Sequence, residues 1–224
     1  MVKQDLIDRS PVRYFEKATK GGLKAGEIGV LTSKKGLGKT SVLVQIGLDT
    51  LLQDKQIVHV SFDQQSDYVM TWYEDIFAEI AKKKNITNVA EIKADFLRKR
   101  VILNFNQDTV VAAQIVRTLK ALAEGGINTA CLIIDGLDFG KVTADDMNVL
   151  KTFAKEAQAV IWFSCNAETS DISSVNKFIA DKVDAVVYLE QKPDAIEMKI
   201  LKAGVPVEGT NLKLDSKTLL IAEK

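Results

Sequence analysis

The segment Ser33-Lys34-Lys35-Gly36-Leu37-Gly38-Lys39-Thr40 decides how the rest of the chain is interpreted. It lies between a short apolar run at residues 27–32 (EIGVLT) and a segment of helical period at residues 39–53. A strand, a glycine-containing loop and a helix in this order are typical of a phosphate-binding loop. Glycine permits the tight turn that points backbone N–H groups at phosphate oxygens, and the helix adds its positive N-terminus. The sequence therefore predicts that nucleotide phosphates bind here.

The residue types of this loop indicate separate roles. We expect the residues from Ser33 through Ser41 to surround the phosphates, with Lys39 reaching the β- and γ-phosphates and assisting catalysis. The Thr40 hydroxyl is the expected ligand of Mg²⁺. The full pattern begins with glycine where this chain has Ser33, and the alternative is a Lys/Gly loop that only caps a helix. The position between a strand and a helix favours the phosphate loop.

A second apolar run, Cys131-Leu132-Ile133-Ile134-Asp135, ends in a carboxylate. Any buried strand can end in aspartate, so this pattern alone is weak. Together with a phosphate loop upstream, it predicts that Asp135 holds a metal-bound water beside Thr40. Asp138 follows three residues later, and we interpret it as a loop residue and not as a ligand.

Short runs rich in Val and Ile alternate with segments of helical period along the whole chain. Strands are expected at residues 27–32, 56–62, 101–105, 129–134, 159–164, 184–190 and 196–201, and helices at residues 39–53, 68–83, 109–124, from 143 onward and 172–182. This alternation predicts an α/β fold with a mainly parallel central sheet flanked by helices.

The C-terminal part breaks the alternation, because its strands follow one another without helices. We therefore expect antiparallel strands at that edge, with a terminal hairpin formed by residues 211–215 and 217–222. Residues 1–224 are expected to form one domain, with a lead-in at residues 1–26 and the C-terminal hairpin within residues 205–224.

Composition bears on partners and compartment. The 224 residues include 30 Lys and Arg and 30 Asp and Glu, so the formal net charge is zero. Nucleic-acid binding is possible, but charge does not support it. Cys131 and Cys165 stand in apolar runs and read as buried thiols in a reducing compartment. The N-terminus is polar, and no apolar run approaches the ~20 residues that span a bilayer. We expect a cytoplasmic protein without a membrane segment.

Four further stretches carry a family pattern: the lead-in GGLKAGE at residues 21–27, HVSFD at residues 59–63, FIADKVDAVVYL at residues 178–189, and residues 196–204. Together with the loop they resemble the RecA/KaiC/DnaB branch of P-loop ATPases over nearly the whole chain. The resemblance implies a single RecA-like domain, ATP and Mg²⁺ as cofactors, and a homo-oligomer whose nucleotide site lies at a subunit interface.

The chain departs from this family at positions that carry the chemistry. Where the family has a catalytic glutamate, this chain has Asp63, which is one methylene shorter. The sensor position corresponds to Cys165, with Asn166 next. The strand tip that reaches a neighbouring site keeps Lys199 and Lys202 as candidates but lacks arginine. Such an arginine is worth ~10³-fold or more in phosphoryl transfer, so the resemblance implies slow hydrolysis.

Three functions stay open at this level. The first is a slow ATPase that assembles head-to-tail or acts on a partner, the second a non-hydrolysing ATP-binding regulatory module, and the third a recombinase-like or helicase-like motor on DNA. The substitutions named above favour the first two. Three other conspicuous side chains have ordinary structural interpretations: His59 within a strand, and Trp72 and Trp162 as parts of the core.

Overall fold

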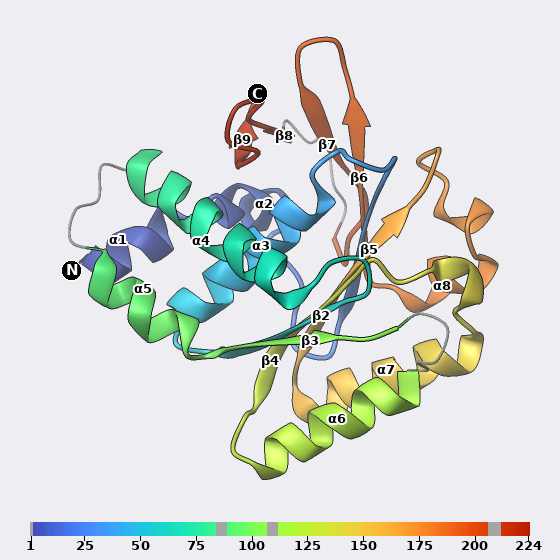
Figure 1. Ribbon diagram of the computed structural model, residues 1–224. Coiled ribbons are helices and arrows are strands. Elements are labelled where there is room, and N and C mark those ends of the chain that lie inside the picture. Colours follow the sequence, from blue (N-terminus) through green and yellow to red (C-terminus); the bar gives the residue numbers. More distant parts are fainter. Residues whose placement is uncertain (1, 84–88, 107–111, 206–211) are drawn as a thin grey trace.

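One sheet organises the molecule. The computed structural model describes residues 2–83, 89–106, 112–205 and 212–224. Within them, nine strands pair in the order β3-β2-β4-β5-β1-β6-β7-β8-β9 (Figure 1). The strands are β1 (Ile28–Ser33), β2 (Gln56–Ser61), β3 (Arg100–Asn104), β4 (Thr129–Asp135), β5 (Val160–Asn166), β6 (Ala185–Gln191), β7 (Ile196–Lys202), β8 (Leu212–Leu214) and β9 (Ile221–Glu223). Pairing is parallel from β3 to β6 and antiparallel from β6 to β9, which confirms the predicted fold class.

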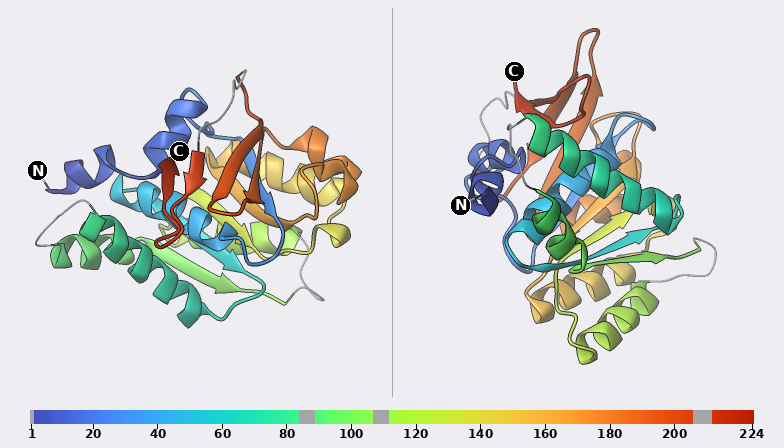
Figure 2. Two further views of the ribbon diagram at one scale, coloured as in Figure 1. Left: turned by 90° about the horizontal axis from the view of Figure 1, so that it is seen from above. Right: turned by 60° about the vertical axis from the view of Figure 1, so that its left-hand side comes forward.

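Helices cover both faces of the sheet, as Figures 1 and 2 show. The α3 layer, on one face, contains α1 (Val2–Asp8), α2 (Val12–Ala18), α3 (Lys39–Leu52), α4 (Ser66–Lys83) and α5 (Ala90–Leu97). The α7 layer, on the other face, contains α6 (Ala112–Glu124), α7 (Ala144–Ala157) and α8 (Lys177–Lys182), with the short 3₁₀ turns η1 (Phe139–Lys141) and η2 (Ile172–Ser174). None of the described helices is long and apolar enough to cross a membrane.

Side chains of each parallel strand enter these layers alternately. In β5, Trp162 packs in the α3 layer and Phe163 in the α7 layer, and both are buried. The alternation follows from the pleat, in which successive side chains point to opposite faces. It decides which residues of a strand can reach the loop between β1 and α3.

Two local signals of the sequence produce the expected helix ends. The Thr143 side chain accepts a hydrogen bond from the Asp146 N–H, and the Asp146 carboxylate accepts one from the Thr143 N–H, so α7 begins with a capping box. After α6, Gly126 has φ +88°, a left-handed conformation that ends a helix and favours glycine.

The sequence analysis named no helix in the lead-in at residues 1–26, and its described part contains two, α1 and α2. Leu6, Val12 and Phe15 are buried, and the Phe15 ring meets Trp162 edge-on at 5.7 Å between centroids. These helices are short, and their apolar residues are too few to show a clear period. Long-range packing on the sheet stabilises them.

Two other differences are smaller. Helix α5 was not expected, and it is held by Phe96, whose ring lies 4.7 Å from that of Phe77. The helix expected at residues 172–182 is divided into η2 and α8. The predicted helix start at residue 109 and the predicted hairpin start at residue 211 lie outside the described residues.

Candidate functional site

The loop between β1 and α3 has the backbone that its glycines permit. Gly36 and Gly38 have φ values of +85° and +90°, in the left-handed region that L side chains rarely adopt. Gly38 is the N-cap of α3. The loop therefore delivers the chain into a 14-residue helix whose free N–H groups and positive dipole end point toward the loop.

Ser33 fits the start of this loop without backbone strain. It is the last residue of β1, is fully buried, and is not among the described non-glycine residues with positive φ. Its hydroxyl donates to the Lys34 carbonyl oxygen at 2.6 Å and accepts from Lys39 Nζ at 3.0 Å. The replacement of glycine by serine at this position therefore adds a contact to the loop and leaves its turn intact.

Lys39, the first residue of α3, points its ammonium group back at the loop. Nζ donates to the Ser33 and Lys34 carbonyl oxygens at 3.3 and 3.1 Å, in addition to the Ser33 hydroxyl. Burial lowers the pKa of Lys39, and the nearby Asp135 carboxylate opposes that shift. The oxygens that Lys39 contacts are uncharged, and an anionic oxygen is a stronger acceptor for an ammonium group.

The end of β4 meets the start of α3 through a carboxylate. Thr40 Oγ1 donates to Asp135 Oδ2 at 2.8 Å, and Ser164 Oγ donates to Asp135 Oδ1. The Gly136 N–H in turn donates to Ser164 Oγ at 2.9 Å. Hydrogen bonds from two elements, α3 and β5, thus fix the rotamer of Asp135, which is 8% exposed. The sequence predicted that Thr40 and Asp135 would be neighbours, and the structure brings them into direct contact.

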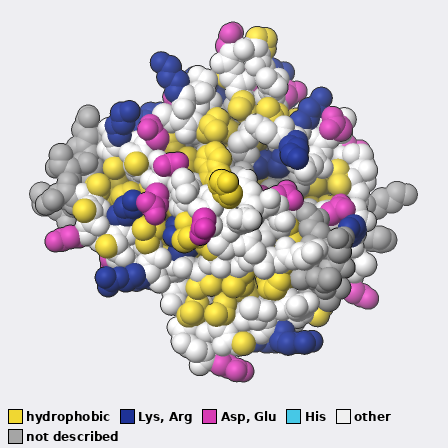
Figure 3. All heavy atoms as spheres, in the orientation of Figure 1, with side chains coloured by type: hydrophobic (Ala, Val, Ile, Leu, Met, Phe, Trp, Pro, Cys, Tyr) yellow, Lys and Arg dark blue, Asp and Glu magenta, His cyan; other side chains and the backbone are white. Residues whose placement is uncertain are grey.

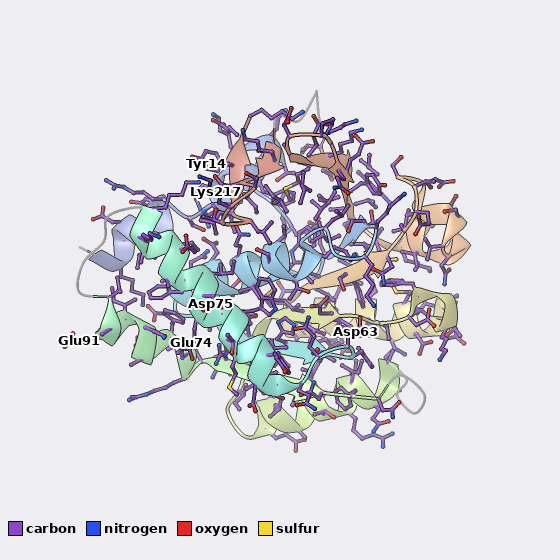
Figure 4. The ribbon with its side chains drawn as sticks, turned by 45° about the horizontal axis from the view of Figure 1, so that its top comes forward. Tyr14, Asp63, Glu74, Asp75, Glu91 and Lys217 are labelled. Atoms are coloured by element: carbon purple, nitrogen blue, oxygen red, sulfur yellow. The ribbon has the colours of Figure 1, made fainter. Side chains whose placement is uncertain are left out.

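Asp63 lies in the turn after β2, against the turn after β4. A Cβ atom added at Gly136 would come within 2.6 Å of the Asp63 carboxyl carbon, and Gly136 has φ +82°. Both the conformation and the space therefore require glycine at residue 136. Figure 4 shows Asp63 well apart from Glu74 and Asp75, which lie further along α4. Asp63 belongs to the loop region and not to an acidic cluster on that helix.

These groups surround a cavity of about 460 Å³ at the carboxyl ends of the parallel strands. Its lining consists of Lys35, Gly36, Gly38, Lys39, Thr40, Ser41, Asp63, Gln64, Trp72, Asp135, Gly136, Leu137, Ser164, Asn166 and Leu219. Ser33, Lys34 and Leu37, which the sequence also placed around the phosphates, do not line it. Leu37 packs against the apolar core, and Lys34 Nζ lies 3.5 Å from Glu168 Oε2.

The assignment of the sensor position to Cys165 is wrong in the structure. Cys165 is 2% exposed and packs in the α7 layer, where burial raises the pKa of its thiol to about 12. Its two neighbours in β5, Ser164 and Asn166, line the cavity instead. The error is one of parity, because adjacent residues of a strand face opposite layers.

Trp72 was interpreted as core, and it has two roles. It packs against the apolar core from α4 and also lines the cavity. Trp162 is buried in the core, as expected, and does not line this cavity. Leu219 was not expected in the site, because no signal in the sequence connects the turn between β8 and β9 at residues 215–220, here called the C-terminal turn, to the loop.

No protein-family model matches the sequence. The DNA repair protein RadA of Rickettsia conorii is 19% identical to this chain over 203 residues, which cover 84% of the chain and 40% of RadA. The chain thus spans about two-fifths of the length of that protein. This distant similarity agrees with the mainly parallel sheet and its flanking helices. The fold is RecA-like.

In this RecA-like domain, hydrogen bonds join the C-terminal turn to α3. The Leu219 carbonyl oxygen accepts from Ser41 Oγ at 3.2 Å and from Gln45 Nε2 at 2.9 Å, and the Ile221 N–H donates to Gln45 Oε1 at 2.8 Å. Leu219 itself has φ +55°, a costly conformation for this residue type. These contacts make the C-terminal turn one wall of the cavity.

The two lysines considered for a neighbouring site lie outside the cavity. Lys199 Nζ lies 2.7 Å from Glu190 Oε2 within the β6–β7 hairpin, and hydrogen bonds from Lys192 and Lys199 lower the pKa of Glu190 to about 2. Lys202 Nζ donates to the Ala180 carbonyl oxygen at 2.9 Å. β7 runs antiparallel to β6, so Lys202 lies level with the start of β6. It is therefore at the end of the strands that is opposite to the loop.

Proposed function

We propose that this protein binds ATP with Mg²⁺ in the cavity beside the loop. The observation that carries the proposal is the hydrogen bond from Thr40 Oγ1 to Asp135 Oδ2, which joins the first turn of α3 to the end of β4. A hydroxyl and a carboxylate in this relation are the pair that P-loop ATPases use at the metal ion. The resemblance of the sequence and the RecA-like fold support the same conclusion.

The residues of the cavity fit both cofactors. The glycine turns and the N-terminus of α3 offer N–H groups to phosphate oxygens. Lys39 would exchange its carbonyl contacts for phosphate oxygens. Thr40 would bind Mg²⁺ through its hydroxyl oxygen, and Asp135 would hold a water of the ion. When bound, Mg²⁺ would neutralise phosphate charge.

Titration with a fluorescent ATP analogue tests this proposal, with Lys39→Ala as the decisive variant. The loss of a charge-assisted contact to two phosphates should weaken binding by about 100-fold. Lys34→Ala is the matched control, since it removes the same charge from the same loop at a side chain that does not line the cavity. Equal affinity in wild type and Lys39→Ala would contradict the proposal.

We further propose slow hydrolysis, with Asp63 as the residue that activates the attacking water. Its carboxyl group lies against Gly136 in the cavity wall, which supports a fixed position for it. Phosphate release should fall by about 10²-fold or more in Asp63→Asn, which keeps the shape and removes the base. If neither protein releases phosphate at any protein concentration, the function is that of a non-hydrolysing regulatory module.

Self-assembly belongs to the same proposal. Lys202 lies toward the edge of the sheet opposite the loop, so it can serve a neighbour's cavity and not its own, and Lys199 is the second candidate. Turnover per molecule should then rise with protein concentration, and Lys202→Ala should remove that rise. A rate per molecule that is constant over concentration would exclude a role in trans.

Association with DNA is a second candidate function, favoured by the name of the similar protein, the DNA repair protein RadA. Charge does not add support, since basic and acidic residues are equal in number and are interspersed on the face in Figure 3. Retention on single-stranded DNA at moderate salt, dependent on ATP, would establish this function. Elution together with a neutral control protein would exclude it.

A further inference from the structure

His59 is a fully buried polar side chain directly behind the metal-binding side of the cavity. It lies in β2, opposite Ile133 of β4, and is 0% exposed. Its Nδ1 is 3.1 Å from the Tyr73 hydroxyl oxygen, and its Nε2 is 4.0 Å from Asp135 Oδ2. Among the residues that the structure describes, Nε2 has no hydrogen-bond partner. A buried polar atom in this state calls for an explanation, such as strain, a catalytic role, or a bound water or ion.

The surroundings of His59 select one form of its ring. The ring is 0% exposed, and burial away from water favours its neutral form. A neutral imidazole carries its proton on one nitrogen. A bare Nε2 facing a carboxylate oxygen would place two lone pairs against each other. The proton therefore belongs on Nε2, where it points toward Asp135, and Nδ1 accepts from the Tyr73 hydroxyl.

Tyr73 contacts the other nitrogen of the imidazole ring. Its ring packs edge-on against the imidazole, and the Arg100 guanidinium lies 4.9 Å from its ring centre. The hydroxyl reaches His59 through a space left by Gly47 in the middle of α3, where an added Cβ would come within 2.6 Å of the hydroxyl oxygen. Glycine inside a helix is destabilising relative to alanine. Here the absence of a side chain at Gly47 leaves room for the Tyr73 hydroxyl, which contacts His59.

We propose that His59 is a positioning residue for Asp135: its Nε2–H faces the oxygen that also accepts from Thr40 and keeps that carboxylate oriented for the hydrated metal ion. In this form Nδ1 accepts from the Tyr73 hydroxyl. This inference rests on the proposed function, because it gives a role to the same carboxylate. Asp135 then accepts hydrogen bonds from α3 and β5, and the His59 ring nitrogen of β2 faces it at 4.0 Å. Partners of this kind typically change metal affinity by about 10- to 100-fold when removed.

Nitrogen NMR of the imidazole tests the ring form without any nucleotide. The chain contains one histidine, so its two ring nitrogens are identified without further assignment. We expect the neutral Nε2–H form in wild type, and a changed Nδ1 signal in Tyr73→Phe, which removes only the hydroxyl. The Nδ1–H form, or an even mixture, in wild type would overturn the inference.

The second measurement is the factor by which Mg²⁺ raises affinity for the fluorescent ATP analogue. His59→Leu should reduce this factor by about tenfold and leave the affinity in EDTA unchanged. His59→Gln should restore most of it, since the glutamine amide can present an N–H near the Nε2 position. Ile133→Val, a buried change in the paired residue, is the control for lost packing and should keep the wild-type factor.

The outcomes separate the two proposals. A wild-type Mg²⁺ factor in His59→Leu, or an equal reduction in Ile133→Val, would overturn the role of His59 alone. Absence of nucleotide binding in wild type would overturn the proposed function together with this role. If His59→Leu does not fold, Tyr73→Phe replaces it, with an expected reduction of a few fold. An unchanged factor and an unchanged ring form in that variant would also overturn the inference.

Discussion

The two layers of the molecule differ in what the same strands bury in them. Five of the seven buried polar side chains of β1, β2, β4 and β5 face the α3 layer: Ser33, His59, Ser61, Asp135 and Ser164. The other two are Thr129, beside the register shift at the start of β4, and Thr32. Thr32, which faces the α7 layer, bonds to the Val187 carbonyl oxygen across the sheet. The α7 layer is mainly a packing surface, and the polar side chains of the proposed nucleotide site lie on the side of the α3 layer. Substitutions in the α7 layer should therefore lower stability with little effect on nucleotide affinity, whereas substitutions on the α3 side of the site should change affinity or turnover.

The largest effect on stability should come from the α7 layer. Phe163 is fully buried in β5, and its ring meets Phe139 edge-on at 5.3 Å. Phe163→Ala should lower the free energy of unfolding by about 3–5 kcal/mol and leave the nucleotide affinity of the folded protein near wild type. Denaturant unfolding and analogue titration measure the two quantities. A large loss of affinity in the folded variant would break the proposed separation of the layers.

Gln45→Ala tests the attachment of the C-terminal turn to α3. The change removes partners from the Leu219 carbonyl and the Ile221 N–H, so we expect a loss of about 2 kcal/mol. Hydrogen exchange should rise first in β8 and β9, and nucleotide affinity should fall because a cavity wall loosens. Exchange that rises evenly over all strands would show that the turn is not separately attached.

Gly136→Ala should act on both folding and chemistry. The left-handed φ and the contact with Asp63 predict a loss of about 1–2 kcal/mol and a displaced Asp63 carboxyl group. Phosphate release should therefore fall more than nucleotide affinity does. Gly126→Ala is the matched control, because it also has positive φ but has open space around the added Cβ. Equal effects on turnover in the two variants would remove Asp63 from the account.

Ser33→Gly should have the smallest effect. Ser33 has no positive φ, so glycine gains nothing there and loses the hydroxyl that contacts Lys39. We expect a loss of stability of about 0.5–1 kcal/mol and an affinity for nucleotide within a few fold of wild type. An affinity gain of tenfold or more would mean that the serine distorts the loop.

The sequence was a good guide where a pattern is local. The loop glycines, the helix start at Thr143 and the carboxylate at Asp135 each follow from a short motif, and the alternation of elements predicted the α/β class. It was a poor guide where contacts depend on strand parity or on distant packing. Because adjacent residues of β5 face opposite layers, Ser164 and Asn166 line the cavity and Cys165 does not. Tertiary contacts brought Leu219 and Trp72 to the loop and gave His59 its place behind Asp135.

The most direct test of the central claim is calorimetric titration of ATP into wild type and Asp135→Asn, each with Mg²⁺ and with EDTA. The account predicts that Mg²⁺ strengthens binding in wild type by about tenfold or more and has little effect in Asp135→Asn, whose affinity in EDTA stays near wild type. Equal Mg²⁺ enhancement in both proteins, or no ATP binding by wild type, would contradict it.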